Sequence, residues 1–313
     1  MQAEEIAGIA AALGRPVAGV ATLAGGFSHE TCLLTLGDGQ VVARIGGSDP
    51  AIEAAIMAAA GRLVPVPRVL HVLPSAQGAD GARPAMVLEY VEGTPLSQVL
   101  SVGRADGMGA LGAEVGRVVA RIGAVGFDQP GFFADERLAV SQESPWSQQL
   151  PEFAAQCMAA APQARLDPVT RQAWAGLCAV HAPALTAIDH HARLVHADVN
   201  PKNFLVTRAS GGWRVDAVLD WEFSFAGCTY GDAANMARFG ADYPAPFRTG
   251  FLDAFAEHQP ADLPLQKNWR YLGHVLDMFA LSDLVTRPPG HLVADQAAGV
   301  IRRWVAEGVP GDG

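Results

Sequence analysis

The chain has 313 residues, of which 50% are hydrophobic and 17% are charged, and its formal net charge is −10 at pH 7. This much apolar material excludes a disordered or fibrous chain, and the acidic balance argues against a general nucleic-acid binder, which needs a basic surface. An acidic surface attracts a cationic small molecule over long range, but it also serves solubility alone.

The cysteines and the N-terminus favour a cytoplasmic protein. The opening residues, "MQAEEIAGIAAALGRP", carry acids where a signal peptide needs bases, and no apolar run reaches the roughly 18 residues of a membrane span. The sequence predicts neither a membrane nor a nucleic-acid partner, and it gives no oligomeric state. The cysteines, which form neither a CxxC pair nor a disulfide framework, are Cys32, Cys157, Cys178 and Cys228.

The first part of the chain is predicted to be rich in strands. Residues 17–45 contain short runs of Val, Leu and Thr, and the "GDG" at 37–39 is typical of a hairpin turn because Asp-Gly accepts positive φ angles. An Ala-rich helix is expected over 49–63, capped by Asp49 and with Pro50 in its first turn. A further helix over 3–13 and strands over 68–73 and 84–90 complete this part.

After about residue 92 the periodicity becomes helical, with two strand-like pieces at 203–207 and 213–220. The sequence therefore predicts an α+β protein with a small antiparallel-sheet N-terminal lobe, residues 1–92, and a larger, mainly helical C-terminal lobe, residues 93–313. The expected helices cover residues 107–125, 146–161, 167–183, 232–240, 246–258, 266–286 and 293–307.

A very polar stretch, "HADVNPKN" at 196–203, lies between apolar runs, and the strand after it ends in "VLDWEF". Asp198, Asn203 and Asp220 can converge there, and two carboxylates with an amide oxygen are ligands that suit Mg²⁺. Phosphoryl transfer needs such a metal, together with a carboxylate that orients a hydroxyl and accepts its proton. The spacing H-x-D-x-x-x-x-N, with an Asp 22 residues after the first Asp, supplies both.

These two segments resemble the aminoglycoside phosphotransferase and choline kinase-like family, whose members have a bilobal protein-kinase-like fold. The resemblance implies that Asp198 is the catalytic base, that His196 braces the loop, and that Asn203 and Asp220 hold Mg²⁺. "YGDAANMARF" resembles a further family segment and makes Asp232 a structural acid. Ala197 stands where the family has Gly, which is expected to be tolerated if φ there is negative.

The resemblance also implies ATP, or alternatively GTP, as the phosphate donor. The loop "LAGGFSHETCLL" would face the phosphates with backbone N–H groups near Phe27 and Ser28. Arg44 replaces the usual Lys of the third strand, and its expected partner is Glu53, the only acid of "AIEAAIMAAAG". The segment "MVLEYVEG" matches the family's hinge, with Leu88 at the pocket wall and backbone contacts from Glu89 and Val91.

The acceptor is expected to be a small molecule with a hydroxyl, and the net negative charge of the chain suits a cationic one. Candidate ligands are acids of the helical lobe, chiefly Glu222, Asp232 and Asp277, and the segment 126–150 is expected on the acceptor side. An antibiotic such as an aminoglycoside is the first expectation. The alternatives are an acceptor of the choline, homoserine or ketosamine type, a less polar acceptor against the lobe's aromatic residues, and a nucleotide-binding pseudokinase without transfer activity. No nucleophile elbow, Walker A or dinucleotide motif occurs.

Overall fold

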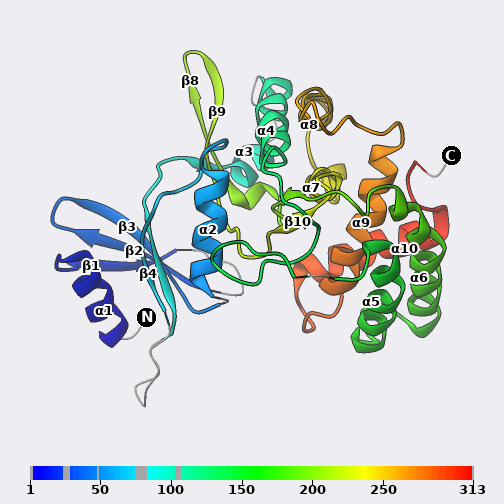
Figure 1. Cartoon of the computed structure of the whole chain (residues 1–313), viewed down its shortest axis with the longest axis horizontal. Helices are drawn as coiled ribbons and strands as arrows, with labels where there is room; N and C mark the ends of the chain where they lie inside the picture. The colour runs from blue at the N-terminus through cyan, green and yellow to red at the C-terminus, as the bar shows by residue number, and fades with distance from the viewer. Residues whose placement is uncertain are drawn as a thin grey trace.

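The computed structural model describes residues 3–23, 29–47, 49–74, 83–102, 107–141 and 143–311. A five-stranded antiparallel sheet lies at one end of the molecule and a mainly helical part at the other (Figure 1). The α+β class is therefore confirmed, whereas the boundary at residue 92 stays a prediction. The sheet has the order β1-β2-β3-β5-β4, with β1 at Gly19–Thr22, β2 at Glu30–Leu36, β3 at Gly39–Ile45, β4 at Val69–Leu73 and β5 at Ala85–Glu89.

One hairpin and one helix set the geometry of the sheet part. The register of β2 and β3 pairs Leu36 with Gly39, which confirms a tight turn at the "GDG". Its two central residues are Gly37 and Asp38, and the positive φ expected for Asp-Gly is absent at all three positions, so that reason for the turn was wrong. Alternate side chains of these strands are buried, and they pack with Ile9 of α1 (Ala3–Leu13) into a small core. The sheet is thereby covered on this face by a helix that the chain forms before its first strand (Figure 1).

Helix α2 (Pro50–Ala60) joins the sheet to the rest of the molecule. Asp49 caps it as expected, because its carboxylate accepts a hydrogen bond of 2.9 Å from the Ala51 N–H. The helix ends three residues earlier than expected, at a turn where Gly61 donates to the Met57 carbonyl. Ile56 and Met57 belong to the large core of the helical part rather than to the small core behind the sheet.

The helical part contains a short helix that the sequence did not indicate, α3 (Leu96–Val102). The seven expected helices are present, and most of their ends lie within about three residues of the expected bounds. They are α4 (Met108–Ile122), α5 (Trp146–Ala160), α6 (Pro168–His181), α7 (Tyr230–Ala237), α8 (Ala245–Glu257), α9 (Trp269–Leu284) and α10 (Leu292–Glu307). Short 3₁₀ turns lie at Ala182–Ala187, Pro201–Asn203 and Gly240–Asp242.

Helices α4 and α8 cross with their backbones in contact. A Cβ added at Gly112 would lie 2.1 Å from the Phe247 carbonyl oxygen, and one at Gly116 would lie 2.2 Å from that of Phe251. Gly250 of α8 meets the backbone of α4 in the same way. Only glycine allows this approach, so these positions fix the separation of the two helices.

Two small sheets frame the polar loop. Strand β7 (Arg193–Val195) pairs with β10 (Phe225–Gly227), and neither strand was expected. Strands β8 (Phe204–Ala209) and β9 (Gly212–Val218) form the expected hairpin, and β6 (Thr94–Pro95) extends it. The polar loop thus runs from β7 to β8, and Asp220 follows β9 by two residues.

The largest hydrophobic core runs through both parts of the molecule. It contains Met86 and Leu88 of β5 and Ile56 of α2 together with buried residues of the helices. Within the described part of the chain, every helix is too short or too polar to cross a membrane.

Candidate active site

The backbone of the polar loop is held from below by Asp232, in the first turn of α7. One carboxylate oxygen accepts from the His196 N–H and the other from the Ala197 N–H, both at 2.9 Å. Asp232 is fully buried, and burial raises its pKa to about 6. The structure therefore places Asp232 beneath the loop as a brace, consistent with the structural acid that the resemblance implies, and not on a surface open to an acceptor.

The loop bends through a left-handed residue at Ala197. Its φ is +67°, so the negative φ that would make Ala equivalent to Gly here is absent. Among the described residues other than glycine, Leu138 and Asp220 also have positive φ. Ala197 of the polar loop and Asp220 after β9 thus both have a left-handed backbone, which costs about 1 kcal/mol or more for a residue such as Ala.

The carboxylate of Asp198 is oriented by two side-chain amides of its own loop. Asn200 donates to one oxygen at 2.9 Å, and Asn203 donates to the other at 2.8 Å. Asn203 also donates to the Asp198 carbonyl. Each carboxylate oxygen keeps a further lone pair, so Asp198 can still accept a hydrogen bond from a hydroxyl.

His196 is a buried brace rather than a reactive group. Its Nε2 donates to the Leu219 carbonyl at 2.9 Å, which leaves Nδ1 to accept from the Asp198 N–H at 3.2 Å. The ring is fully buried and lies against Trp221, with 4.5 Å between ring centroids. His196 therefore connects the polar loop to the segment that carries Asp220, as the resemblance implies.

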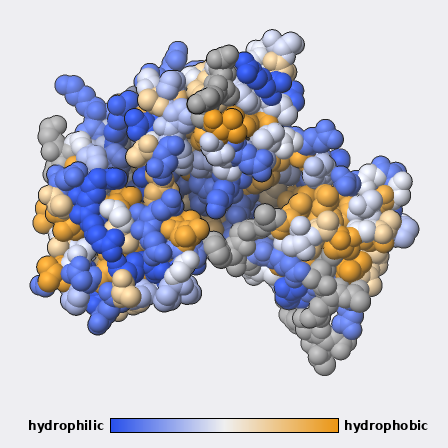
Figure 2. All heavy atoms as spheres, turned by 180° about the vertical axis from the view of Figure 1, so that it is seen from behind, coloured by the Kyte–Doolittle hydropathy of each residue, from blue (hydrophilic) through white to orange (hydrophobic). Residues whose placement is uncertain are grey.

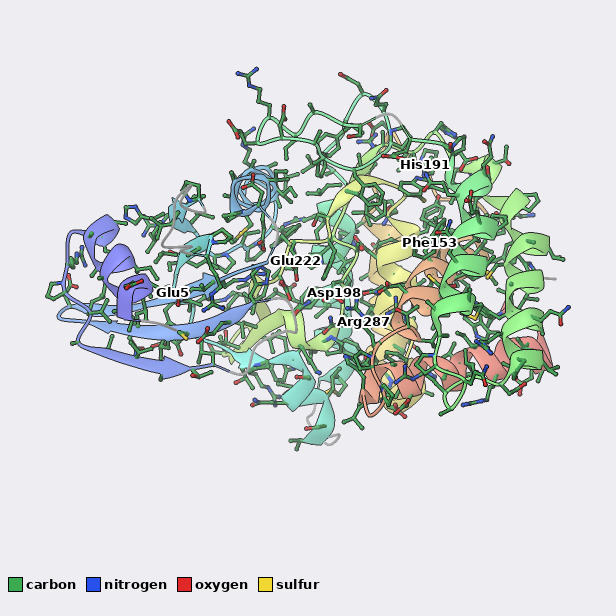
Figure 3. The ribbon with its side chains drawn as sticks, turned by 90° about the horizontal axis from the view of Figure 1, so that it is seen from below. Glu5, Phe153, His191, Asp198, Glu222 and Arg287 are labelled. Carbon is green, nitrogen blue, oxygen red and sulfur yellow. The ribbon has the colours of Figure 1, made fainter. Side chains whose placement is uncertain are left out.

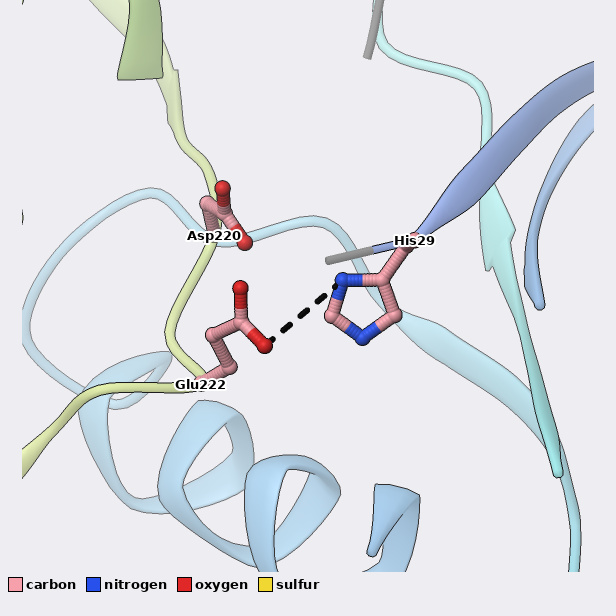
Figure 4. A group of neighbouring side chains, drawn as sticks. All are labelled: His29, Asp220 and Glu222. Carbon is pink, nitrogen blue, oxygen red and sulfur yellow. Dashed lines mark ion pairs between the residues drawn. The ribbon is translucent and has the colours of Figure 1, made fainter. Parts of the chain in front are cut away.

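Asp220 lies in a compact group with Glu222 and His29 (Figure 4). The Nδ1 atom of His29 is 3.7 Å from Oε2 of Glu222, and one ligand atom from each of the three side chains lies within 4.8 Å of the others. Burial, with a further contribution from Arg44, lowers the pKa of His29 to about 4, so the ring is neutral at neutral pH.

Arg44 connects the sheet to this group. It forms an ion pair with Glu53, which confirms the expected pairing, and donates to Asp220 at 2.6 Å. Glu53 in turn accepts a hydrogen bond of 3.1 Å from the Trp221 N–H. Glu53 is only 3% exposed, and this burial raises its pKa against the opposing effect of Arg44. One strand, one helix and the "DWEF" segment are thus joined around a single guanidinium.

The expected nucleotide contacts are placed only in part. Phe27 and Ser28 lie outside the described residues. Leu88 is buried in the large core, while Glu89 and Val91 are half-buried at the junction of the two parts. The Glu89 N–H donates to the Arg68 carbonyl, so this N–H is already engaged within the protein.

The remaining acids predicted for the acceptor are already engaged. Asp277 is 4% exposed and forms an ion pair with Arg238. Burial opposes the charge of Arg238, but Asp277, with help from Asp198, raises its pKa overall. Glu222 belongs to the Asp220 group. Arg238 therefore places a positive charge near Asp198, and Asp277 balances this charge.

Segment 126–150 lies beside β10, which follows the "DWEF" segment, as a bridge between Gly131 and Ala226 shows. Rings from both segments are in contact: Phe132 and Trp146 lie 5.5 and 5.1 Å from Phe225 between centroids. Phe132 also lines a cavity of about 260 Å³ with Glu222, Phe223 and residues of α2. The surface here is aromatic, whereas Trp221 and Tyr230 proved to be fully buried core residues.

Asp198 and Glu222 both lie in the middle of the molecule, where the sheet part meets the helical part (Figure 3). The surface is hollowed between the two parts on the face that Figure 2 shows. Sequence reasoning missed His29 here. Its one signal was its position directly after "GGFS", in the loop expected to meet phosphate.

Known proteins resemble this chain in sequence family and in fold. A family model described as "Phosphotransferase enzyme family" matches residues 19–265, whereas no protein of curated function matches the chain in sequence. A thermostable mutant of aminoglycoside phosphotransferase APH(4)-Ia, solved in ternary complex with ADP and hygromycin B, superposes with a TM-score of 0.69 at 15% identity. The match covers 96% of this chain and 97% of that chain.

Two further solved structures are similar. One is titled "Putative fructosamine-3-kinase" from Haemophilus somnus, with a TM-score of 0.62, 14% identity, and coverage of 95% of this chain and 96% of that chain. The other is a GDP complex of aminoglycoside 2'-phosphotransferase-IIIa, with a TM-score of 0.58, 16% identity, and coverage of 93% and 89%. At these identities the similarity shows the fold, and the expected bilobal protein-kinase-like fold is confirmed.

Proposed function

Because the chain belongs to the phosphotransferase enzyme family, we propose that it transfers the γ-phosphate of ATP, or alternatively of GTP, to a hydroxyl of a small antibiotic-like molecule. The observation that carries this proposal is the geometry of Asp198. Its carboxylate is oriented by Asn200 and Asn203 on a loop whose backbone is tied to buried Asp232. A carboxylate held in this way is suited to orient an acceptor hydroxyl and to take its proton.

The oxygen ligands fit the metal ion that phosphoryl transfer requires. The Asn203 amide nitrogen is bound to Asp198, so its oxygen faces away from that carboxylate, and Asp220 and Glu222 add carboxylate oxygens. Asn203 and Asp220 would hold the ion, which when bound neutralises charge on the phosphates. Arg44 carries a permanent charge, and once released from Asp220 it can donate to phosphate oxygens while Glu53 keeps its position.

The structure favours two kinds of acceptor. An antibiotic acceptor is supported by the similar structure solved with hygromycin B. A metabolic hydroxyl compound is the second candidate, because Asp232 and Asp277 both have partners inside the protein and so do not form an open acidic pocket for a polycation. The similarity to a protein titled as a fructosamine kinase is consistent with the second candidate.

The decisive experiment is a phosphate-transfer screen with ATP and GTP over aminoglycosides, other antibiotics and small metabolic alcohols, comparing the wild type with Asp198→Asn. We expect transfer to at least one acceptor and a loss of about a thousandfold or more in the variant, with an unchanged melting temperature. Lys202→Gln, an exposed change in the same loop, is the control and should retain activity. A loss of only a few-fold in Asp198→Asn would exclude Asp198 as the base, and nucleotide binding without any transfer would support the pseudokinase alternative.

A further inference from the structure

We propose, resting on the proposed function, that His29 and Glu222 are further ligands of the divalent cation that Asn203 and Asp220 would hold. The imidazole of His29 gives the site a preference for a first-row transition ion such as Mn²⁺ over Mg²⁺.

The side chains of His29, Asp220 and Glu222 are already spaced for one ion. In an octahedral shell with ion–ligand distances of about 2.1 Å, adjacent ligand atoms lie about 3 Å apart and opposite ones about 4.2 Å apart. His29 Nδ1 lies 3.7 Å from Glu222 Oε2, and all three ligand atoms lie within 4.8 Å of one another (Figure 4). The side chains of His29 and Glu222 are 8% and 6% exposed, so an ion bound by them would be sheltered from solvent.

A cationic group already occupies the position between two of these ligands. Nη2 of Arg44 donates to Asp220 Oδ1 at 2.6 Å and lies 3.1 Å from His29 Nδ1. A guanidinium can only donate hydrogen bonds, so Nδ1 must present its lone pair and the ring proton must be on Nε2. The imidazole thus directs toward Arg44 the Nδ1 lone pair through which it would bind a metal ion.

The backbone at Gly47 leaves space for the imidazole ring of His29. Gly47 has a φ of +83°, and a Cβ at this position would lie 2.1 Å from His29 Nε2. The ring therefore fills space that any other residue at position 47 would occupy. His29 is held between Gly47 on one side and Arg44 on the other, which makes its orientation a property of the fold.

The nature of the ligand determines which ion is preferred. Carboxylate and amide oxygens suit Mg²⁺, which keeps several of its waters, whereas a neutral imidazole contributes more to binding of first-row transition ions. When nucleotide and ion bind, Nη2 of Arg44 is free to move to a phosphate while Nη1 stays on Glu53. His29, Asp220 and Glu222 can then close on the ion.

The test is pulsed electron paramagnetic resonance of Mn²⁺ bound with ADP to the full chain, compared for protein with ordinary and with ¹⁵N-labelled histidine. We expect nitrogen modulation that changes with the label in the wild type and disappears in His29→Gln. The Kd for Mn²⁺ should rise about tenfold in this variant, whereas that for Mg²⁺ should change less than about twofold. His71→Gln, a half-buried histidine on β4, is the matched control and should keep the signal.

Two further variants separate the possible failures. Gly47→Ala displaces the ring while keeping His29 in the sequence, so the histidine signal should disappear there too. If Mn²⁺ binds, and Asp220→Asn weakens that binding, but no signal responds to the histidine label, the role of His29 is overturned while the proposed function stands. If Asp220→Asn leaves Mn²⁺ binding unchanged, the metal assignment of the proposed function fails, and the role of His29 fails with it.

Discussion

Replacing Ala197 with Gly should stabilise the protein, although it removes a methyl group next to the catalytic loop. At φ +67° a residue with a Cβ loses about 1 to 2 kcal/mol relative to its right-handed conformation, and Gly does not. Gly in turn adds about 0.4 to 1 kcal/mol of conformational entropy to the unfolded chain. The difference is a gain of about 0.5 to 1 kcal/mol in the free energy of unfolding, or about 1 to 2 °C in the melting temperature of a chain of this size.

The control for this prediction is the same change at a position with negative φ. Ala192 lies five residues earlier, is half-buried, and accepts a hydrogen bond from the Phe127 N–H, so its backbone is equally ordered. Ala192→Gly should lower the free energy of unfolding by about 0.5 to 1 kcal/mol. Thermal unfolding of both variants, followed by circular dichroism, measures the two effects. If Ala197→Gly lost as much stability as Ala192→Gly, the strain assigned to Ala197 would be absent.

Two more changes test the buried charges. Arg44→Met should cost about 3 to 5 kcal/mol of unfolding free energy, because Glu53 is left buried without its partner, and should raise the KM for ATP about tenfold or more. Adding Glu53→Gln should recover part of the stability in urea unfolding; no recovery would contradict this reasoning. For Asp232, whose pKa of about 6 lies above the ordinary 3.8, the stabilising proton is fully bound below about pH 4 and is lost as the pH rises through about 6. The wild type should therefore lose about 2 kcal/mol between pH 4 and pH 7 relative to Asp232→Asn, and parallel stability curves would refute the shift.

Local signals in the sequence were sufficient for much of the fold. The cap at Asp49 and the turn at Gly37-Asp38 depend on neighbouring residues only, and both are present. Strands β7 and β10 were missed because each has three residues and forms by pairing with distant backbone, including the other strand thirty residues away. A periodic pattern of apolar residues can be recognised only in a run longer than three residues.

The candidate site, like the fold, was predicted where it depends on residues close in sequence and missed where it depends on distant ones. The spacing of Asp198, Asn203 and Asp220 could be interpreted because it belongs to one hairpin and its flanking loops. The bond from Arg44 to Asp220 spans 176 positions, and nothing local to either residue predicts it. His29 was missed because its position depends on the space beside Gly47, which only the folded backbone creates.

The large hydrophobic core has a consequence for how the chain unfolds. Ile56, Met57, Met86 and Leu88 come from the first 92 residues, yet they pack in the core of the helical part. A fragment cut near residue 92 would expose these side chains to water, and each would lose about 1.5 to 3 kcal/mol of burial. The two lobes therefore differ in architecture but share one folding equilibrium, so a protease that cuts between them should release no folded fragment.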